Sequence, residues 1–405
     1  MKKSFTVLIA LLVFSTFSQA QKFPGLALTP PMGWNSWNTF ATNINEQIIK
    51  DMADTFVEEG LADAGYNYIV IDDGWMAKER DNLGFLVPDK IKFPNGMKVV
   101  SDYVHSKGLK FGIYNCAGAE TCGGYPGSRG HEYQDAISYA SWGVDYLKYD
   151  WCNTENLNAK GAYETMRDAI YSAGRPMVFS MCEWGDNQPW EWGENVGHLW
   201  RTTGDISACW DCEEHHGTWS SWGVLKIVDM RKDIRKAAGP GHWNDPDMME
   251  IGNGMTVNED RGHFALWSMM AAPLIMGNDL RKASQETLAI LTNADVIAVD
   301  QDSLGIQGFV YKTQDSIEIW AKPLANDDWA ICFLNRTETS KPLNFNWKEN
   351  TINDDVFGYE VSFKDKHFAI RDLFTKKDCG TTNEILKAEI PKHDVLMVRL
   401  SKLKK

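Results

Sequence analysis

The chain has 405 residues, of which 43% are hydrophobic, so it can bury the core of one large domain or two smaller ones. Its formal net charge of −14, from 41 Lys and Arg against 55 Asp and Glu, argues against nucleic acid and anionic membranes as partners, because both need a basic surface. The 17 Trp residues are more telling, since the flat apolar face of an indole suits a carbohydrate ligand.

The first twenty residues predict a cleavable signal peptide. Lys2 and Lys3 precede the mostly apolar run 5–17, and residues 18–20 resemble a cleavage site between small residues. The run is too short for a helix that spans a membrane, and no second apolar stretch of that length follows. We therefore expect a secreted or periplasmic protein that begins near Gln21 and does not insert into a membrane.

From about residue 30 to residue 300 the chain alternates strand-like and helix-like segments. The strand-like segments are 31–34, 66–71, 108–114, 144–149, 176–181, 198–203, 241–246 and 274–279. Helical patterns lie between them, for example at Glu46–Glu59 and Met97–His105, and a glycine follows several expected helix ends. Eight strand–helix units in roughly 270 residues predict an α/β fold of the (β/α)8 TIM-barrel type.

After about residue 305 the pattern changes to short alternating strands. They are expected at 308–312, 316–320, 329–334 and 395–400, and no long helical pattern accompanies them. This pattern favours a small C-terminal antiparallel β-sandwich domain. The predicted organisation is therefore a signal peptide at 1–20, a catalytic barrel at 21–305 and an antiparallel β domain at 306–405.

Charged and aromatic residues collect where the predicted barrel strands end, which is the face that carries the active site in this fold. These residues are Trp37, Asp72, Asp73, Tyr114, Lys148, Asp150, Glu183, Trp184, Arg201, Asp205 and Asp245. One Asp at a strand end often caps a helix, but acids on successive strands favour a functional site. Several carboxylates beside two cations, without a clear triad of metal ligands, predict glycoside hydrolysis, which needs two carboxyl groups. We expect no metal and no other cofactor.

The eight cysteines suit one or two local disulfides in an exported protein whose fold has its own core. Cys209 and Cys212, followed by His215 and His216, faintly resemble a zinc site. In an oxidising compartment the same spacing favours a disulfide within a loop.

Six motifs in chain order make the sequence similar to the family of α-galactosidases and α-N-acetylgalactosaminidases. They are Pro31–Trp37, Ile71–Trp75, Leu147–Cys152, Trp200–Asp205, Trp243–Met248 and Ala272–Asp279. The resemblance runs from Thr29 to Gly305 and is fainter beyond. It implies a barrel with a C-terminal β domain. It also implies an exo-acting, retaining α-galactosidase that removes terminal α-linked galactose from oligosaccharides, polysaccharides or glycoconjugates.

The resemblance also implies roles for single residues. Asp150 matches the nucleophile, Asp205 matches the acid/base, and Asp72 with Asp73 matches the pair that binds the outer hydroxyls of galactose. The other sugar-binding positions are Trp37, Tyr114, Lys148, Glu183, Trp184, Arg201 and Asp245, with Glu183 and Trp184 placed at the 2-position. A Cys122–Cys152 disulfide is implied as well, whereas Gly197 stands where relatives carry a partner for Cys182.

Physical chemistry supports the division between the two catalytic acids. Lys148 lies two residues before Asp150 and shares its side of the strand, so it favours the ionised form that a nucleophile needs. Asp205 must begin protonated, which requires a drier or less cationic setting.

Other activities remain open at this point. An α-N-acetylgalactosaminide needs space that Glu183 and Trp184 would fill, and a β-L-arabinopyranoside lacks the 6-carbon arm that Asp72 and Asp73 would bind. Further alternatives are a carbohydrate-binding protein without activity and a metal-dependent hydrolase. The latter would use His215, His216, His242 and Asp245. The sequence does not indicate an oligomeric state.

Overall fold

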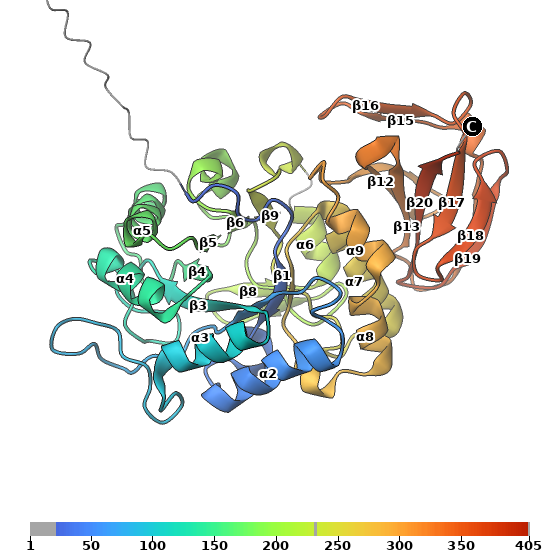
Figure 1. Cartoon of the computed structure of the whole chain (residues 1–405). Coiled ribbons are helices and arrows are strands. Elements are labelled where there is room, and N and C mark those ends of the chain that lie inside the picture. The colour runs from blue at the N-terminus through green and yellow to red at the C-terminus, as the bar shows by residue number, and fades with distance from the viewer. Residues whose placement is uncertain (1–21, 231–232, 404–405) are drawn as a thin grey trace, which may run out of the picture.

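A computed structural model describes residues 22–230 and 233–403 of the protein. The predicted signal peptide lies outside these described residues. Figure 1 shows a larger part built around a central sheet and a C-terminal part made of strands, which lies beside helices α7, α8 and α9. Within the described ranges, no helix combines the length and the apolar composition needed to cross a bilayer.

Eight parallel strands form one curled sheet at the centre of the larger part. In spatial order they are β10 (Leu274–Met276), β1 (Met32–Asn35), β2 (Tyr68–Val70), β3 (Lys110–Cys116), β4 (Tyr146–Asp150), β5 (Val178–Cys182), β6 (Leu199–Arg201) and β9 (Trp243–Asp245). The two end strands meet through Met249, just after β9, which forms a parallel bridge with Met276 of β10. The predicted (β/α)8 barrel is confirmed.

Helices run between the strands and cover the outside of the sheet (Figure 1). They are α1 (Trp37–Phe40), α2 (Glu46–Glu58), α3 (Gly96–Ser106), α4 (Glu132–Trp142), α5 (Ala159–Ala173), α6 (Val224–Met230), α7 (Val257–Met270), α8 (Gln285–Leu291) and α9 (Ala294–Asp300). The Asn45 side chain caps α2 by accepting from the Ile48 N–H, and Gly143 ends α4 in the left-handed conformation that the glycine pattern predicted. Short 3-10 turns occupy Pro189–Glu191, Gly193–Asn195, Arg235–Ala237, Leu280–Lys282, Ala325–Asp327 and Trp347–Glu349.

A hairpin that the sequence pattern did not predict interrupts the sixth strand–helix unit. Its strands are β7 (Glu213–His215) and β8 (Ser220–Trp222), and it precedes α6. The Trp222 N–H donates to the carbonyl of Asp205 at 3.0 Å, and the Ser207 N–H donates to the carbonyl of Trp222 at 2.8 Å. The hairpin is therefore hydrogen-bonded to the chain that follows β6.

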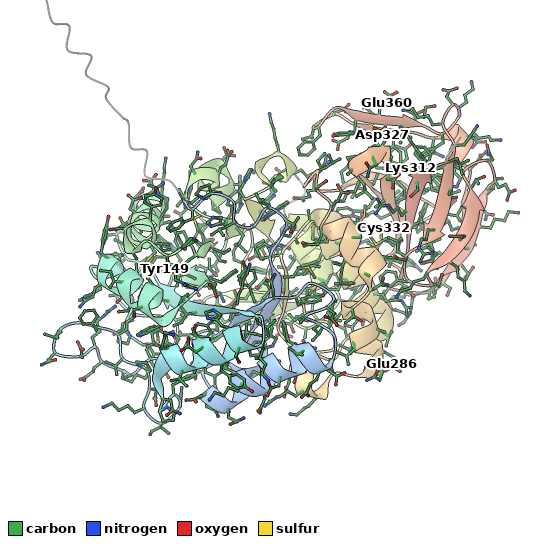
Figure 2. All side chains as sticks on the ribbon, viewed as in Figure 1. Tyr149, Glu286, Lys312, Asp327, Cys332 and Glu360 are labelled. Atoms are coloured by element: carbon green, nitrogen blue, oxygen red, sulfur yellow. A yellow bond between two sulfur atoms is a disulfide. The ribbon has the colours of Figure 1, made fainter. Side chains whose placement is uncertain are left out.

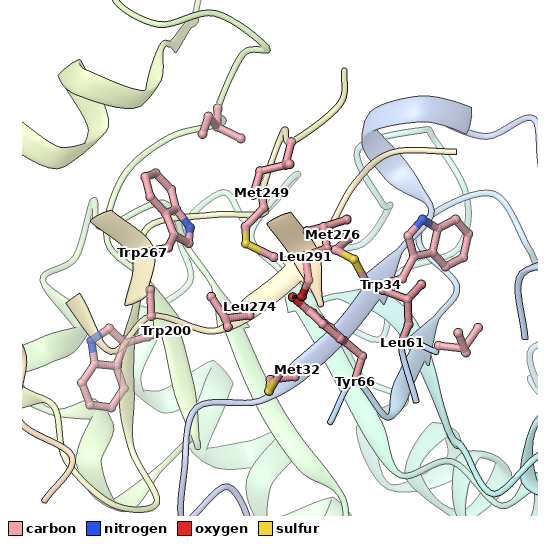
Figure 3. Close-up of a cluster of buried hydrophobic side chains, with 14 of the residues drawn as sticks. Met32, Trp34, Leu61, Tyr66, Trp200, Met249, Trp267, Leu274, Met276 and Leu291 are labelled. Atoms are coloured by element: carbon pink, nitrogen blue, oxygen red, sulfur yellow. Dashed lines mark hydrogen bonds between the residues drawn. The ribbon is translucent and has the colours of Figure 1, made fainter. Parts of the chain in front are cut away.

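Large side chains fill the barrel. Figure 2 shows side chains occupying the space between the ribbons, and Figure 3 shows one buried cluster that includes Trp34, Trp200, Trp267 and Met276. Trp34 donates its indole N–H to the Asn278 carbonyl at 2.8 Å, so burial of this polar group is compensated. Many of the Trp residues thus build the core, and fewer remain for a ligand site.

The C-terminal part is antiparallel throughout its described strands. Its main sheet has the order β11 (Phe309–Gln314), β12 (Ile317–Pro323), β13 (Trp329–Asn335), β20 (Val395–Lys402), β17 (Phe368–Asp372) and β18 (Lys377–Thr381). Two further pairs are β14 (Lys341–Phe345) with β19 (Leu386–Ile390), and β15 (Thr351–Asp354) with β16 (Tyr359–Ser362). A separate hydrophobic cluster lies between the main sheet and these pairs, as expected for a sandwich.

The main sheet also packs against the barrel through its other face. Trp320 and Met397 belong to the same buried cluster as the barrel core. Lys322 is fully buried, and its ammonium donates to the Ser268 carbonyl at 2.9 Å and the Val299 carbonyl at 2.7 Å. Arg235 forms two hydrogen bonds with Asp354, at 3.1 and 2.7 Å. Apolar packing and buried charge together join the two parts.

Candidate active site

The C-terminal ends of the barrel strands surround a cavity of about 610 Å³. It receives side chains from the loops after several strands, as expected for this fold. Of the eleven predicted catalytic and sugar-binding residues, the cavity is lined by Trp37, Asp72, Tyr114, Asp150, Trp184 and Asp205. The remaining five, which are Asp73, Lys148, Glu183, Arg201 and Asp245, do not line it.

Asp150 is the last residue of β4 and is almost completely buried. The Tyr114 hydroxyl donates to Asp150 Oδ2 at 3.0 Å, and the Trp151 N–H donates to Oδ1 at 2.8 Å, so both carboxylate oxygens have defined positions. Burial raises the pKa of Asp150 to about 6, and the opposing effect of Lys148 is smaller. Lys148 lowers the pKa of Asp150, as predicted, but loss of hydration on burial raises it by more.

Asp72, which follows β2, is held by donors from β1 and β4. Its Oδ2 accepts from Lys148 Nζ at 2.8 Å and from Asn35 Nδ2 at 2.7 Å. Asp72 lines the cavity, so the pair places a fixed carboxylate at the wall with the Lys148 ammonium beside it. Such a carboxylate can accept hydrogen bonds from sugar hydroxyls.

Asp73 has a different position from its neighbour Asp72. Its Oδ2 accepts from the Gly123 N–H at 2.7 Å and its Oδ1 accepts from the Gly74 N–H at 2.7 Å. Burial raises the pKa of Asp73. Asp73 therefore orders the glycine-rich loop after β3 and does not line the cavity.

Asp205 and Arg201 belong to a group of charges that the sequence identified only in part. Arg201 Nη2 lies 3.1 Å from Asp205 Oδ1 and 2.9 Å from Asp247 Oδ2. Asp247 is buried, and burial raises its pKa against the opposing effect of Arg201. The side chain of Asp205 is 38% exposed. Arg201 is thus shared between one open and one buried carboxylate.

Asp245 supports Asp247 and does not line the cavity. Its Oδ1 accepts from the Asp247 N–H at 2.9 Å, within the turn that follows β9. Sequence reasoning selected Asp245 because it ends the predicted strand, and it missed Asp247 two residues later. The signal that could have found it is the Asn-Asp-Pro-Asp sequence, which offers two acids at one strand end.

The side chains of Glu183 and Trp184 lie in different surroundings although the two residues are adjacent in sequence. Trp184 lines the cavity and has φ 60°, a left-handed conformation that is unfavourable for a non-glycine residue. Glu183 is fully buried, and its Oε2 accepts from Asn187 N at 2.6 Å and from Asn187 Nδ2 at 2.8 Å. Burial raises its pKa to about 7. Of the two residues expected at the sugar's 2-position, only Trp184 lines the cavity in this structure.

The implied Cys122–Cys152 disulfide is present, and both cysteines line the cavity. The Cys209–Cys212 disulfide closes a short loop before the β7–β8 hairpin, and Cys182 is a buried free thiol.

The histidines of the metal-hydrolase alternative do not form a ligand set. Over residues 22–230 and 233–403, the group whose ligand atoms come close enough for one metal ion is Cys122, Asp150 and Cys152. The two sulfurs of that group are bonded to each other. His242 stacks near Trp200, with ring centroids 6.3 Å apart, and His216 stacks on Trp219. The geometry therefore does not favour the metal-dependent alternative.

Several cavity residues were not anticipated from the sequence. Asp186 lies in the loop after β5, and the β7–β8 hairpin contributes Thr218, Trp219, Ser220 and Trp222. The abundance of Trp was the one available signal, but it did not indicate which indoles lie in a site.

Comparison with known proteins agrees with this architecture. A family model described as Alpha galactosidase A matches residues 29–302, and one described as Alpha galactosidase C-terminal beta sandwich domain matches residues 314–400. The Alpha-galactosidase A of Cellvibrio japonicus is 56% identical over 394 residues, which cover 97% of this chain and 97% of that protein.

Solved structures give the same result. Alpha-galactosidase I from Mortierella vinacea has a TM-score of 0.85 and 33% identity, covering 94% of this chain and 99% of its own. The α-galactosidase of Saccharomyces cerevisiae, solved with raffinose, has a TM-score of 0.85 and 31% identity, covering 94% of this chain and 99% of its own.

Proposed function

The chain belongs to the alpha-galactosidase A family and is a glycoside hydrolase. On that premise we propose that it is a retaining α-galactosidase that removes terminal α-linked galactose from oligosaccharides or polysaccharides. The observation that carries the proposal is that Asp150, at the end of β4, and Asp205, in the loop after β6, line the same cavity. Raffinose in the yeast relative supports an α-galactosyl oligosaccharide as the substrate.

In the first step the Asp150 carboxylate attacks the anomeric carbon of galactose. The bond to the glycosidic oxygen breaks as Asp205 gives its proton to that oxygen, so the leaving group departs as a neutral alcohol. The donors from Tyr114 and Trp151 hold Asp150 in one orientation, which lowers the entropic part of the barrier.

In the second step a water molecule attacks the same carbon. Asp205, now a carboxylate, takes a proton from the water, and the bond between galactose and Asp150 breaks. Two inversions at one carbon release galactose in the α configuration. Asp205 regains its proton and Asp150 its negative charge, so the cycle is closed.

Asp205 is the open one of the two catalytic carboxyl groups. The side chain is 38% exposed and is paired with Arg201, which is shared with Asp247. A sugar in the cavity would cover the exposed part of Asp205, because this side chain lines the cavity. At the same time Asp72 would bind hydroxyls of galactose, while Trp37 and Trp184 would contact its apolar faces.

The wall at Trp184 favours galactose over its N-acetylated analogue. An acetamido group at the 2-position would have to displace the indole, and overpacking a rigid site costs about 1–3 kcal/mol or more. We expect kcat/KM to be highest for the α-galactoside, lower for the β-L-arabinopyranoside and near background for the α-N-acetylgalactosaminide. Glu183→Ser should raise the last value only modestly, because Trp184 remains. Equal cleavage of both galactosides by the unsubstituted enzyme would contradict this.

Product stereochemistry tests the mechanism. Early NMR spectra of a turnover reaction should show α-galactose first, because retaining enzymes hold their carboxyl groups about 5–5.5 Å apart, too close for an intervening water. Asp150→Ala should abolish turnover, whereas Asp205→Ala should spare substrates with strongly acidic leaving groups. Appearance of β-galactose first would refute the mechanism.

Export through the N-terminal segment is part of the proposal. The two disulfides support an oxidising compartment, where such bonds persist. N-terminal sequencing of protein recovered from the periplasm or medium should begin near Gln21, and exclusively cytoplasmic full-length protein would contradict export.

A further inference from the structure

A second hollow adjoins the cavity on the side of the acid/base. It has a volume of about 540 Å³, close to that of the cavity itself, and we call it the outer groove. Trp37, Asp205 and Trp219 line both spaces, whereas Asp150, Asp72 and Tyr114 line only the cavity. The outer groove therefore begins at Asp205 and leads away from the nucleophile.

This position matters because of where the general acid must act. The acid gives its proton to the oxygen that joins galactose to its leaving group, so the leaving group lies on the acid's side of the galactose. Another hollow, of about 560 Å³, borders the cavity near Trp151 and Cys152, but Asp205 does not line it. The outer groove is the hollow that meets the requirement.

Trp219 forms the exposed aromatic wall of the outer groove. It lies in the turn of the β7–β8 hairpin and is 52% exposed. Its ring stacks on His216 with centroids 4.1 Å apart, and His216 in turn contacts the Ser221 hydroxyl at 2.8 Å. The indole is thus supported from one side and keeps much of its surface for a ligand.

The hairpin has a defined position relative to the reacting bond. The hairpin is hydrogen-bonded to Asp205 and Ser207 through Trp222. Directly after the hairpin, the Gly223 N–H donates to the Cys212 carbonyl at 2.9 Å, at the Cys209–Cys212 disulfide. A side chain at Gly223 would meet Cys209 Sγ at 2.8 Å, so the disulfide packs directly against the end of the hairpin. These contacts reduce the entropy that a flexible loop would lose on binding.

The polar lining indicates the chemistry of the occupant. Glu250 accepts hydrogen bonds from Asn38 and Asn253, and these three residues line the outer groove with Glu214. Carboxylates and amides beside an exposed indole suit a neutral ligand with many hydroxyls and an apolar face. An anionic leaving group would be repelled.

We propose that the outer groove binds the first sugar unit of the leaving group and that Trp219 stacks on this sugar. This rests on the proposed function and assigns to the β7–β8 hairpin a preference for galactosyl oligosaccharides over simple galactosides. Trp219 is accordingly a specificity residue for the aglycone.

The test compares melibiose, whose leaving group is glucose, with methyl α-galactoside, whose leaving group is methanol. Both need a proton from the acid, so the ratio of their kcat/KM values isolates contact with the leaving sugar. Trp219→Ala should lower the ratio of melibiose to methyl galactoside about tenfold, equivalent to about 1.4 kcal/mol. Trp219→Phe keeps a flat ring and should restore most of the ratio. Tyr133→Ala, which removes an aromatic residue that is 50% exposed on α4, should leave the ratio unchanged.

Other results would overturn the inference. An equal loss on both substrates for Trp219→Ala would mean that the residue only positions Asp205, and an unchanged ratio would mean that no sugar contacts it. A greater loss on benzyl α-galactoside than on melibiose would assign the outer groove to an apolar group instead. If the unsubstituted enzyme cleaves none of these substrates, the proposed function itself is refuted and this inference falls with it.

Discussion

Gly204 offers a precise way to disturb the acid/base without altering its chemistry. It directly precedes Asp205, and a Cβ atom there would lie 2.3 Å from Cζ3 and 3.1 Å from Cη2 of Trp222. Gly204 does not have a positive φ, so the backbone accepts alanine and the conflict is with the indole alone. The ring and the chain at Gly204 must separate by about 1 Å before ordinary contact at 3.4 Å is reached.

We expect Gly204→Ala to lower kcat/KM for methyl α-galactoside about 100-fold, since a displacement of about 1 Å at a catalytic group can have that effect. The loss on 2,4-dinitrophenyl α-galactoside should be much smaller, because this leaving group needs no proton. Overpacking should also reduce the free energy of unfolding by about 1–3 kcal/mol in a urea titration. Gly161→Ala is the matched control, since its nearest contact would be an ordinary 3.4 Å to Asn158 Oδ1.

Relief of the clash provides the decisive comparison. In a Trp222→Leu background the Gly204→Ala substitution should have little further effect, so the two changes should be strongly non-additive. The reasoning is wrong if Gly204→Ala leaves kcat/KM unchanged on both substrates. It is also wrong if Gly204→Ala lowers kcat/KM as much in the Trp222→Leu background as in the unsubstituted enzyme.

Three further predictions concern Asp150, a disulfide and the junction of the two parts. Burial raises the pKa of Asp150 to about 6, so kcat/KM should fall as the pH drops below about 6 and the free nucleophile becomes protonated; an acid limb near pH 4 would contradict this. Replacing Cys122 and Cys152 together by Ser should lower the free energy of unfolding by about 3–4 kcal/mol in the chain-entropy model, because the bond joins residues 30 apart; equal denaturation midpoints would exclude that contribution. Arg235→Ala leaves the buried Asp354 carboxylate without its cation and should cost about 3–5 kcal/mol in urea unfolding, whereas adding Asp354→Asn should recover part of the loss; a double variant as unstable as the single one would argue against a charge effect.

The barrel could be predicted because local and global signals agree in it. The segment that ends at Asp150 is rich in residues that favour strands, with Val144, Tyr146, Leu147 and Tyr149 before the acid. Glycines such as Gly143 then mark the helix ends. The β7–β8 hairpin could not be recognised in this way, because its strands have three residues each and its residues do not alternate between apolar and polar.

The site was less predictable than the fold. Position at a strand end indicates which residues reach one face of the barrel, but not which way each side chain turns. Glu183 points towards Asn187, whose backbone and side-chain N–H groups both donate to it. Asp73 points towards Gly123, whose N–H donates to it. The Asn-Asp-Pro-Asp sequence offers Asp247 as a second acid, but its pairing with Arg201 joins segments that are far apart in the chain. Trp219 depends on the β7–β8 hairpin, which the sequence pattern did not predict.

The buried contact between the barrel and the C-terminal strands has a consequence for how the molecule unfolds. Lys322 reaches across to carbonyls at the ends of α7 and α9, and Trp320 and Met397 share a core with barrel residues. Removing the strands would uncover this apolar surface and leave those carbonyls without their donor. The two parts are therefore coupled thermodynamically, and heating should melt them in a single cooperative transition, so that loosening the distant sheet also weakens the scaffold that holds Asp150.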